Sequence, residues 1–213
     1  MIEWKTSKKP VAYDLAVKKM RKRVAAIHNK KSHELIWLLE HPHLFTAGTS
    51  AKEEHLLERK LLPVIKSDRG GSFTYHGPGQ RIIYIMLDLE KHGKDIRNFV
   101  WKLEEWVIKT LSNFGVAGER YNGLVGIWIM PRDNFRTARA YKIASIGLRL
   151  RRWVSYYGIS INVNPDLEYF RGIVPCGNEG FGVTSLHKEG LKTTLNELDT
   201  NLKEEFEKIF GSQ

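Results

Sequence analysis

Two segments of the chain place apolar residues at every third or fourth position, the spacing of an amphipathic helix. The first runs from Val11 to Ser32 and has a basic opposite face. The second covers Asp95–Phe114, where Asp95 is a candidate N-cap and Gly115 a stop signal. Both segments are predicted to be helices that bury one face.

Short apolar runs predict strands, and the chain holds them at Leu35–Leu39, Arg81–Leu89, Gly126–Met130 and Lys142–Val163. The last run is too long for one strand, so Gly158 is expected to form a turn or bulge between two strands. Thr193 or Thr194 is expected to cap a final helix that reaches Phe210 and ends at Gly211. Helices and strands therefore mix without regular βαβ alternation, which predicts an α/β or α+β fold with a mixed sheet.

No internal repeat, low-complexity tract or linker divides the 213 residues, so we expect one domain over residues 1–213. The longest apolar run, residues 82–87, is far shorter than the roughly 18 residues of a membrane-spanning helix. The N-terminal segment lacks the apolar stretch of a signal peptide. We expect a cytoplasmic protein without membrane association.

The charge balance changes this picture by suggesting a partner. The chain has 34 Lys and Arg against 24 Asp and Glu, a formal net charge of +10, which favours an acidic partner such as nucleic acid or an acidic protein surface. Basic residues cluster at Lys18–Arg23, at Lys30–Lys31 and at Arg149, Arg151 and Arg152. No helix-turn-helix, zinc-finger or ribonucleoprotein motif accompanies them. A solvated basic surface is the alternative interpretation of each cluster.

Cys176 is the only cysteine, which excludes an internal disulfide and a thiolate-rich zinc site. His41 and His43 are close in sequence, but no carboxylate or cysteine cluster joins them, so no metal site is expected. Cys176 lies in a glycine-rich segment, Arg171–Ser185, where a thiol is more accessible than in an apolar strand. A buried inert cysteine is the alternative.

A nucleophilic thiol is activated by a neighbouring cation, which lowers its pKa. Lys142 is a candidate because it starts a stretch that is otherwise suited to burial. A buried lysine is unfavourable unless it is paired or used chemically. Periodicity alone, however, favours a Lys142 side chain that points to solvent.

The segment Ser67–Arg81 contains four glycines and a proline among fifteen residues. Such a backbone can approach a ligand closely and offer its N–H groups. It has neither a Walker P-loop nor the dinucleotide GxGxxG spacing, so ordinary nucleotide binding is not expected. The structural interpretation is a hairpin and turn, with His76 as a structural hydrogen-bond partner.

Three motifs follow one another along the chain: RGG…TYHGPGQ at 69–80, KIASIG at 142–147 and VPCG at 174–177. In this order they resemble the octanoyltransferases of lipoate biosynthesis, the LipB family, and the similarity extends over about 35–185. Members of that family resemble the catalytic cores of biotin and lipoate protein ligases. The resemblance implies a single α/β domain with a mixed sheet flanked by helices.

The resemblance also implies an activity: transfer of an octanoyl group from octanoyl-acyl carrier protein to a lysine of lipoyl domains, in 2-oxo-acid dehydrogenases and the glycine cleavage H protein. It places the nucleophile at Cys176 and a partner lysine at Lys142, with an acyl-thioester intermediate. Its substrate-binding positions fall on Arg69, Gly70, Gly71, Ser72, Phe73, Thr74, Tyr75, His76, Ser145, Ile146, Gly147, Gly158, Ile159 and Ser160. It implies a monomer that needs no metal, cofactor or ATP.

Three alternatives remain open at this point. An ATP-dependent lipoate or biotin-type ligase shares the fold but does not need Cys176. A nucleic-acid-binding protein would use the basic surface and show steep salt dependence. A non-catalytic carrier-protein binder would bind acyl carrier protein without becoming acylated.

Overall fold

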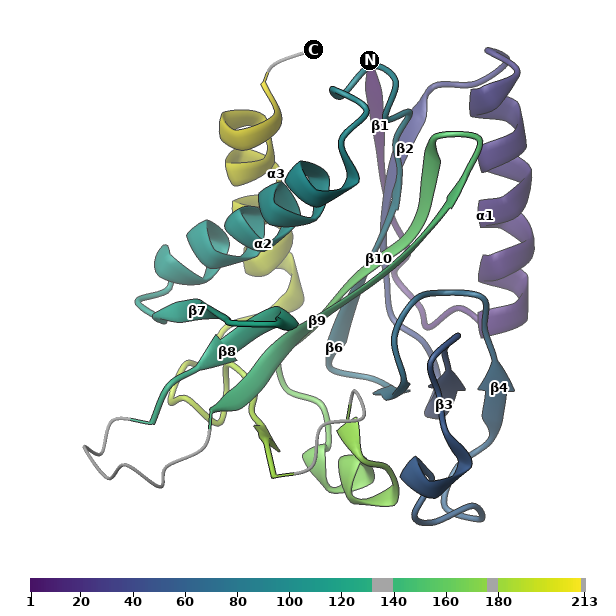
Figure 1. Ribbon diagram of the computed structural model, residues 1–213. Helices are drawn as coiled ribbons and strands as arrows, with labels where there is room; N and C mark the ends of the chain where they lie inside the picture. Colours follow the sequence, from purple (N-terminus) through teal and green to yellow (C-terminus); the bar gives the residue numbers. More distant parts are fainter. Residues whose placement is uncertain (132–139, 176–179, 212–213) are drawn as a thin grey trace.

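The computed structural model describes residues 1–131, 140–175 and 180–211. Its main sheet has the strand order β1-β2-β6-β10-β9-β8-β7, with β11 beside β9 (Figure 1). The strands are β1 (Ile2–Thr6), β2 (Glu34–Leu39), β6 (Gln80–Met86), β7 (Gly118–Tyr121), β8 (Leu124–Ile129), β9 (Tyr141–Arg151), β10 (Val154–Asn162) and β11 (Gly182–Val183). The β1–β2 and β9–β11 pairs are parallel and the others antiparallel, so the sheet is mixed, as predicted.

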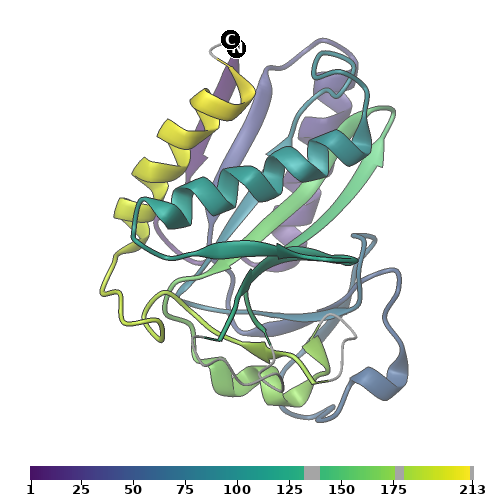
Figure 2. The same cartoon turned by 60° about the vertical axis from the view of Figure 1, so that its left-hand side comes forward.

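Helices cover both faces of this sheet (Figures 1 and 2). Helix α1 (Tyr13–His28) packs on one face through a cluster that includes Met20, Trp37 and Tyr84. Helices α2 (Ile96–Ser112) and α3 (Leu195–Phe210) pack on the other face, around Trp106. The fold class is therefore the predicted α/β class with a mixed sheet flanked by helices.

A second, smaller sheet has the order β4-β3-β5 and lies below α1 in Figure 1. Its strands are β3 (Leu44–Ala47), β4 (Val64–Lys66) and β5 (Phe73–His76), and the short helices η1 (Glu53–His55) and η2 (Leu167–Gly172) lie nearby in sequence or space. Phe45, Tyr75 and Phe170 form its small apolar core. This sheet forms the wall opposite β9 and β10 across the pocket described below.

The predicted helix ends agree with the structure where capping residues were identified. The Asp95 carboxylate accepts from the Asn98 N–H at 3.0 Å and caps α2. Thr194 caps α3 and forms a capping box with Glu197. The first helix is shorter than predicted, because residues 11 and 12 precede its first turn and the chain leaves the helix after His28.

The predicted turn at Gly158 is wrong. The β9–β10 hairpin turns at Arg152 and Trp153, both of which have positive φ, +51° and +63°. Two successive positive φ values suit a tight hairpin, although glycine or asparagine more often fills these positions. Gly158 lies inside β10 instead, where a Cβ atom would come within 2.1 Å of the Ile83 carbonyl oxygen. Its lack of a side chain serves strand packing rather than a turn.

None of the helices in the described ranges is both long and apolar enough to cross a membrane.

Candidate active site

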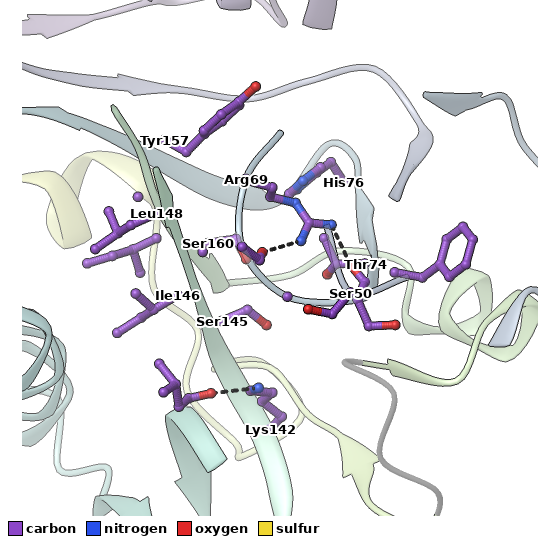
Figure 3. A pocket seen from close by; sticks show the side chains of 18 of the residues that line it. Ser50, Arg69, Thr74, His76, Lys142, Ser145, Ile146, Leu148, Tyr157 and Ser160 are labelled. Carbon is purple, nitrogen blue, oxygen red and sulfur yellow. Dashed lines mark hydrogen bonds between the residues drawn. The ribbon is translucent and has the colours of Figure 1, made fainter. Parts of the chain in front are cut away.

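A cavity of about 700 Å³ lies between the small sheet and strands β9 and β10 (Figure 3). Residues 69–72 of the loop 67–72 and strand β5 form one wall. The pairing between β8 and β9 stops at Ala144. Beyond Ala144, the edge of β9 that faces away from β10 has no strand partner in the described ranges. The cavity passes around this edge: Figure 3 shows Ile146 and Leu148 on one side of β9 and Arg69 and His76 on the other.

Lys142 and nearly all the predicted substrate-binding residues line this cavity. They are Arg69, Gly70, Gly71, Ser72, Phe73, Thr74, His76, Ser145, Ile146, Gly147, Gly158, Ile159 and Ser160. Tyr75 is the exception: its ring is fully buried in the core of the small sheet, and its hydroxyl hydrogen-bonds to His43 Nδ1 at 2.9 Å. Segments far apart in sequence thus meet at one cavity, with Tyr75 beneath its wall.

Arg69 holds the loop wall in place. Its guanidinium is buried and donates from Nη2 to the carbonyl oxygens of Thr46 at 2.8 Å and Ser72 at 2.9 Å, and from Nη1 to that of Gly70 at 2.9 Å. Charge-assisted hydrogen bonds of this kind are stronger than neutral ones. They tie the loop to β3, so the conformation of the loop depends on Arg69.

Glycines let this loop lie directly on β9. The Gly70 N–H donates to the Leu148 carbonyl at 3.0 Å. A Cβ atom at Gly147 would lie 3.1 Å from the Gly70 carbonyl oxygen, and one at Gly70 would lie 3.3 Å from the Leu148 oxygen. The glycines of the RGG and IASIG motifs therefore permit a backbone-to-backbone contact that closes the cavity wall.

Asp68 fixes the same loop from the other side. Its carboxylate accepts from the hydroxyls of Tyr156, at 2.8 Å, and Tyr157, and pairs with Arg21 Nη2 at 3.1 Å. Burial opposes ionisation of Asp68, but hydrogen bonds from both tyrosines and from Arg21 outweigh it and lower the pKa. The loop is thus anchored to α1 and β10 as well as to β3.

Lys142 is buried, with 5% of its surface exposed, so the interpretation that it points to solvent is wrong. Its Nζ donates to the Val125 carbonyl at 2.9 Å and lies 4.7 Å from the centroid of the Trp128 ring (Figure 3 shows the hydrogen bond). A carbonyl dipole and an aromatic face both stabilise a cation. The protein therefore holds this amine at the cavity in a defined position.

Two residues that the sequence analysis did not identify shape the surroundings of Lys142. A Cβ atom at Gly126 would lie 2.5 Å from Lys142 Cε and 3.1 Å from Nζ, so only glycine leaves room for the side chain. The Gly126 N–H donates to Glu104 Oε1 at 3.1 Å, and Glu104 also accepts from Arg120. The sequence signal for Glu104 was an acidic residue on the apolar face of a predicted helix.

His76 is a buried hydrogen-bond partner, in line with the structural interpretation of its sequence context. Its Nδ1 lies 2.8 Å from Gln80 Oε1, to which it donates, and Gln80 in turn donates to Asn162. Burial lowers the pKa of His76 to about 3, and burial likewise lowers that of His41 to about 4. Both imidazoles are neutral near pH 7.

The predicted nucleophile Cys176 lies outside the described residues. The chain that follows it returns to the site: β11 pairs in parallel with the start of β9, with Gly182 beside Tyr141 and Val183 beside Lys142. The Thr184 N–H donates to the Lys142 carbonyl at 3.0 Å. Gly182 comes six positions after Cys176 in sequence, and its backbone is fixed beside Tyr141, the residue before this lysine. Over the described ranges, histidine and acidic side chains form no cluster of three or more that could hold a metal.

Comparison with known proteins identifies the class to which this fold and cavity belong. Residues 12–207 match the family described as the lipoyl protein ligase A/B catalytic domain. The octanoyltransferase of Jannaschia sp. is 52% identical, with both chains fully covered, and that of Caulobacter vibrioides is 52% identical over 99% of this chain and 92% of its own. A bi-partite lipoate protein ligase from Thermoplasma acidophilum shares the fold, with a TM-score of 0.69 and 14% identity over 98% of this chain and 84% of that one.

The chain belongs to the lipoyl protein ligase A/B catalytic domain family. Within this family it groups with the octanoyltransferases, which are acyltransferases, at about half of its residues identical over the full chain.

Proposed function

We propose that the protein transfers an octanoyl group from octanoyl-acyl carrier protein to a lysine of lipoyl domains, through a thioester on Cys176. The acceptors are the lipoyl domains of 2-oxo-acid dehydrogenases and the glycine cleavage H protein. The observation that carries the proposal is the buried Lys142, held at the cavity wall by the Val125 carbonyl and flanked by the strand that follows Cys176. The octanoyltransferase relatives support the choice of acyl group.

The first step forms the acyl-enzyme. A cation near a cysteine favours its thiolate, and we assign this role to Lys142. The Cys176 thiolate attacks the donor carbonyl, the carbon–sulfur bond to the carrier breaks, and the carrier's thiolate leaves and takes up a proton from the Lys142 ammonium, which becomes neutral. The products are an octanoyl-cysteine thioester and a free carrier thiol.

The second step forms the amide. The acceptor lysine attacks the thioester as a neutral amine, the Cys176 thiolate leaves, and the nitrogen releases a proton. Lys142 in its neutral form can accept that proton and return to the ammonium that stabilises the thiolate. Conversion of a thioester to an amide is favourable, so this route does not require ATP.

The cavity suits an apolar tail as well as a reacting thioester. Ile82, Tyr84, Ile146, Leu148 and Ile159 contribute apolar lining. Each CH₂ group that is transferred from water into such a lining gains about 0.8 kcal/mol. A chain of eight carbons therefore gains several kcal/mol, which favours octanoyl over short acyl donors.

The test is intact mass spectrometry after incubation with octanoyl-acyl carrier protein in the absence of ATP. We expect a single octanoyl adduct that hydroxylamine removes, that the Cys176→Ala variant lacks, and that a lipoyl domain discharges. An adduct that appears only with octanoate and ATP, or lipoyl-domain modification that survives Cys176→Ala, would instead establish the ligase.

A further inference from the structure

The net positive charge of the chain is unevenly distributed over the two faces of the main sheet. Helix α1 carries five basic residues in the segment Lys18–Arg23 and one acidic residue, Asp14. Helix α3, on the opposite face, carries five acidic residues and only Lys203 and Lys208 as basic ones (Figure 1). An acidic partner is therefore attracted to the α1 face and repelled by the α3 face.

The α1 face contains a hollow of about 310 Å³ between α1 and the tip of the β9–β10 hairpin. Arg21, Arg149 and Arg151 line it, together with Asp68 and Tyr156. We call this hollow the basic groove. Two basic clusters that are distant in sequence, one on the first helix and one on a hairpin, thus form a single surface. All three arginines are exposed.

The negative charge of the acidic residue in the basic groove is compensated by partners within the protein. Asp68 accepts from both tyrosine hydroxyls and pairs with Arg21, as described above. Arg149 and Arg151 form no ion pair with any acidic residue of the described ranges. Their charges are therefore available to an external partner, while Arg21 also holds the loop wall.

The basic groove and the cavity share a wall. Asp68 is followed directly by Arg69 and Gly70, and the Gly70 N–H bonds to the carbonyl of Leu148, the residue before Arg149. Arg149 lies seven residues along β9 from Lys142, which corresponds to about 23 Å at roughly 3.3 Å per strand residue. The groove therefore adjoins the end of the cavity that is remote from the reacting groups.

We propose that the basic groove docks the acidic surface of the acyl carrier protein that delivers the octanoyl group. This inference rests on the proposed function and specifies its donor surface. A carrier presents its acyl group on a long flexible phosphopantetheine arm, so the carrier's own surface can dock away from the reacting groups. An acceptor lysine has only a four-carbon stem, so a lipoyl domain must dock close to Lys142. The geometry therefore favours the donor over the acceptor as the occupant.

The test compares two donors and two charge-matched variants. The groove variant is R149E/R151E, which leaves Arg21 and its bond to Asp68 intact. The control variant, K192E/K203E, makes the same charge change at two exposed lysines outside the groove. One donor is octanoyl-acyl carrier protein. The other is octanoyl-pantetheine, which carries the arm without the protein. Thermal unfolding verifies that both variants are folded.

We expect the groove variant to lose about tenfold or more in the second-order rate of acyl-enzyme formation from the carrier, since complementary charge raises association rates by 10–10³. Its rate with octanoyl-pantetheine and its discharge by a lipoyl domain should match those of the parent protein within twofold. The control variant should stay within twofold throughout. Added salt should slow the parent with the carrier and reduce its advantage over the groove variant.

Three results would overturn the docking inference while leaving the proposed function intact: equal carrier rates for groove variant and parent, an equal loss with octanoyl-pantetheine, or a loss confined to discharge by the lipoyl domain. The last result would assign the groove to the acceptor. A parent protein that forms no adduct with either donor would overturn the proposed function, and the docking inference with it.

Discussion

The position that a Cβ atom would occupy on Gly126 is 2.5 Å from Cε of Lys142. Gly126 has a φ of +122°, and its N–H donates to the Glu104 carboxylate, which holds the backbone in place. The absence of a side chain at Gly126 leaves space for the lysine. A single methyl group at this point must displace either the strand or the amine. The position of Lys142 thus depends on a glycine that carries no chemistry itself.

Gly126→Ala should therefore lower transfer sharply. Displacement of a reacting group by about 1 Å can reduce a rate by about 100-fold, and we expect a loss of that order in single-turnover transfer to a lipoyl domain. Gly115→Ala is the matched control, because Gly115 also has positive φ, +75°, but its added methyl meets nothing within 4 Å. Similar losses in both variants would show that backbone strain, and not the contact with Lys142, is responsible.

Lys142→Ala should slow formation of the acyl-enzyme at pH 7 by up to about 30-fold, because a cysteine without a cation has a pKa near 8.5 and is only a few per cent thiolate. The deficit in this step should shrink as pH rises through 8.5, since the thiolate then forms unaided. Discharge by the lipoyl domain should remain slow. The control is Lys188→Ala, an exposed lysine above the Tyr141 ring. A pH-independent deficit in the first step would contradict the pairing.

Asp68→Ala should loosen the loop wall, because it removes the acceptor for Tyr156, Tyr157 and Arg21. With octanoyl-pantetheine as donor, which avoids effects of carrier docking, we expect KM to rise several-fold and kcat to change less. The expected loss of stability is about 1–2 kcal/mol, allowing for the partial exposure of the group. Asp14→Ala removes an exposed acidic residue on α1 and should alter neither KM nor kcat. A fall in kcat at constant KM would count against a positioning role.

Acid should destabilise the fold through His41 and His76. Their pKa values, about 4 and about 3, lie below the usual 6.5, so their stability contribution is present above pH 6.5 and is lost as pH falls toward 4 and 3. Each histidine should lower the free energy of unfolding by about 1.4 kcal/mol per pH unit in that range.

Urea unfolding at pH 7.5, 6 and 5 measures this slope. The His41→Gln variant should show about half of the histidine-dependent slope, whereas His33→Gln, at an exposed position, should keep all of it. An unchanged slope in His41→Gln would mean that other groups govern acid unfolding.

The sequence predicted the helices and long strands well because their burial pattern is local. The capping residues Asp95 and Thr194 were readable for the same reason. The short strands β3, β4 and β5 were not predicted, since three or four residues give little periodicity and their pairing is set by distant partners. The hairpin turn was misplaced at Gly158 because glycine usually marks a turn, whereas Arg152 and Trp153 adopt positive φ here.

The candidate site could be assembled only partly from the sequence. Motif order placed Lys142 and the RGG loop together, and the cavity brings them into one lining. The role of Gly126 depends on where the Lys142 side chain turns, which is a tertiary property. Tyr75 was assigned to the site with its neighbours, but alternation along β5 directs it into the core of the small sheet instead.

The strand order also has a consequence for how the chain is made. Strand β6 pairs with β10 on the edge away from β2, and β10 is synthesised about seventy residues later. Until residues 154–162 leave the ribosome, the edge of β6 that will pair with β10 has no partner strand. The residues of β6, all of which are buried in the finished protein, then border an open and apolar sheet edge. The middle of the sheet is therefore completed late, and a nascent or truncated chain that stops before Val154 exposes a surface prone to self-association and dependent on chaperones.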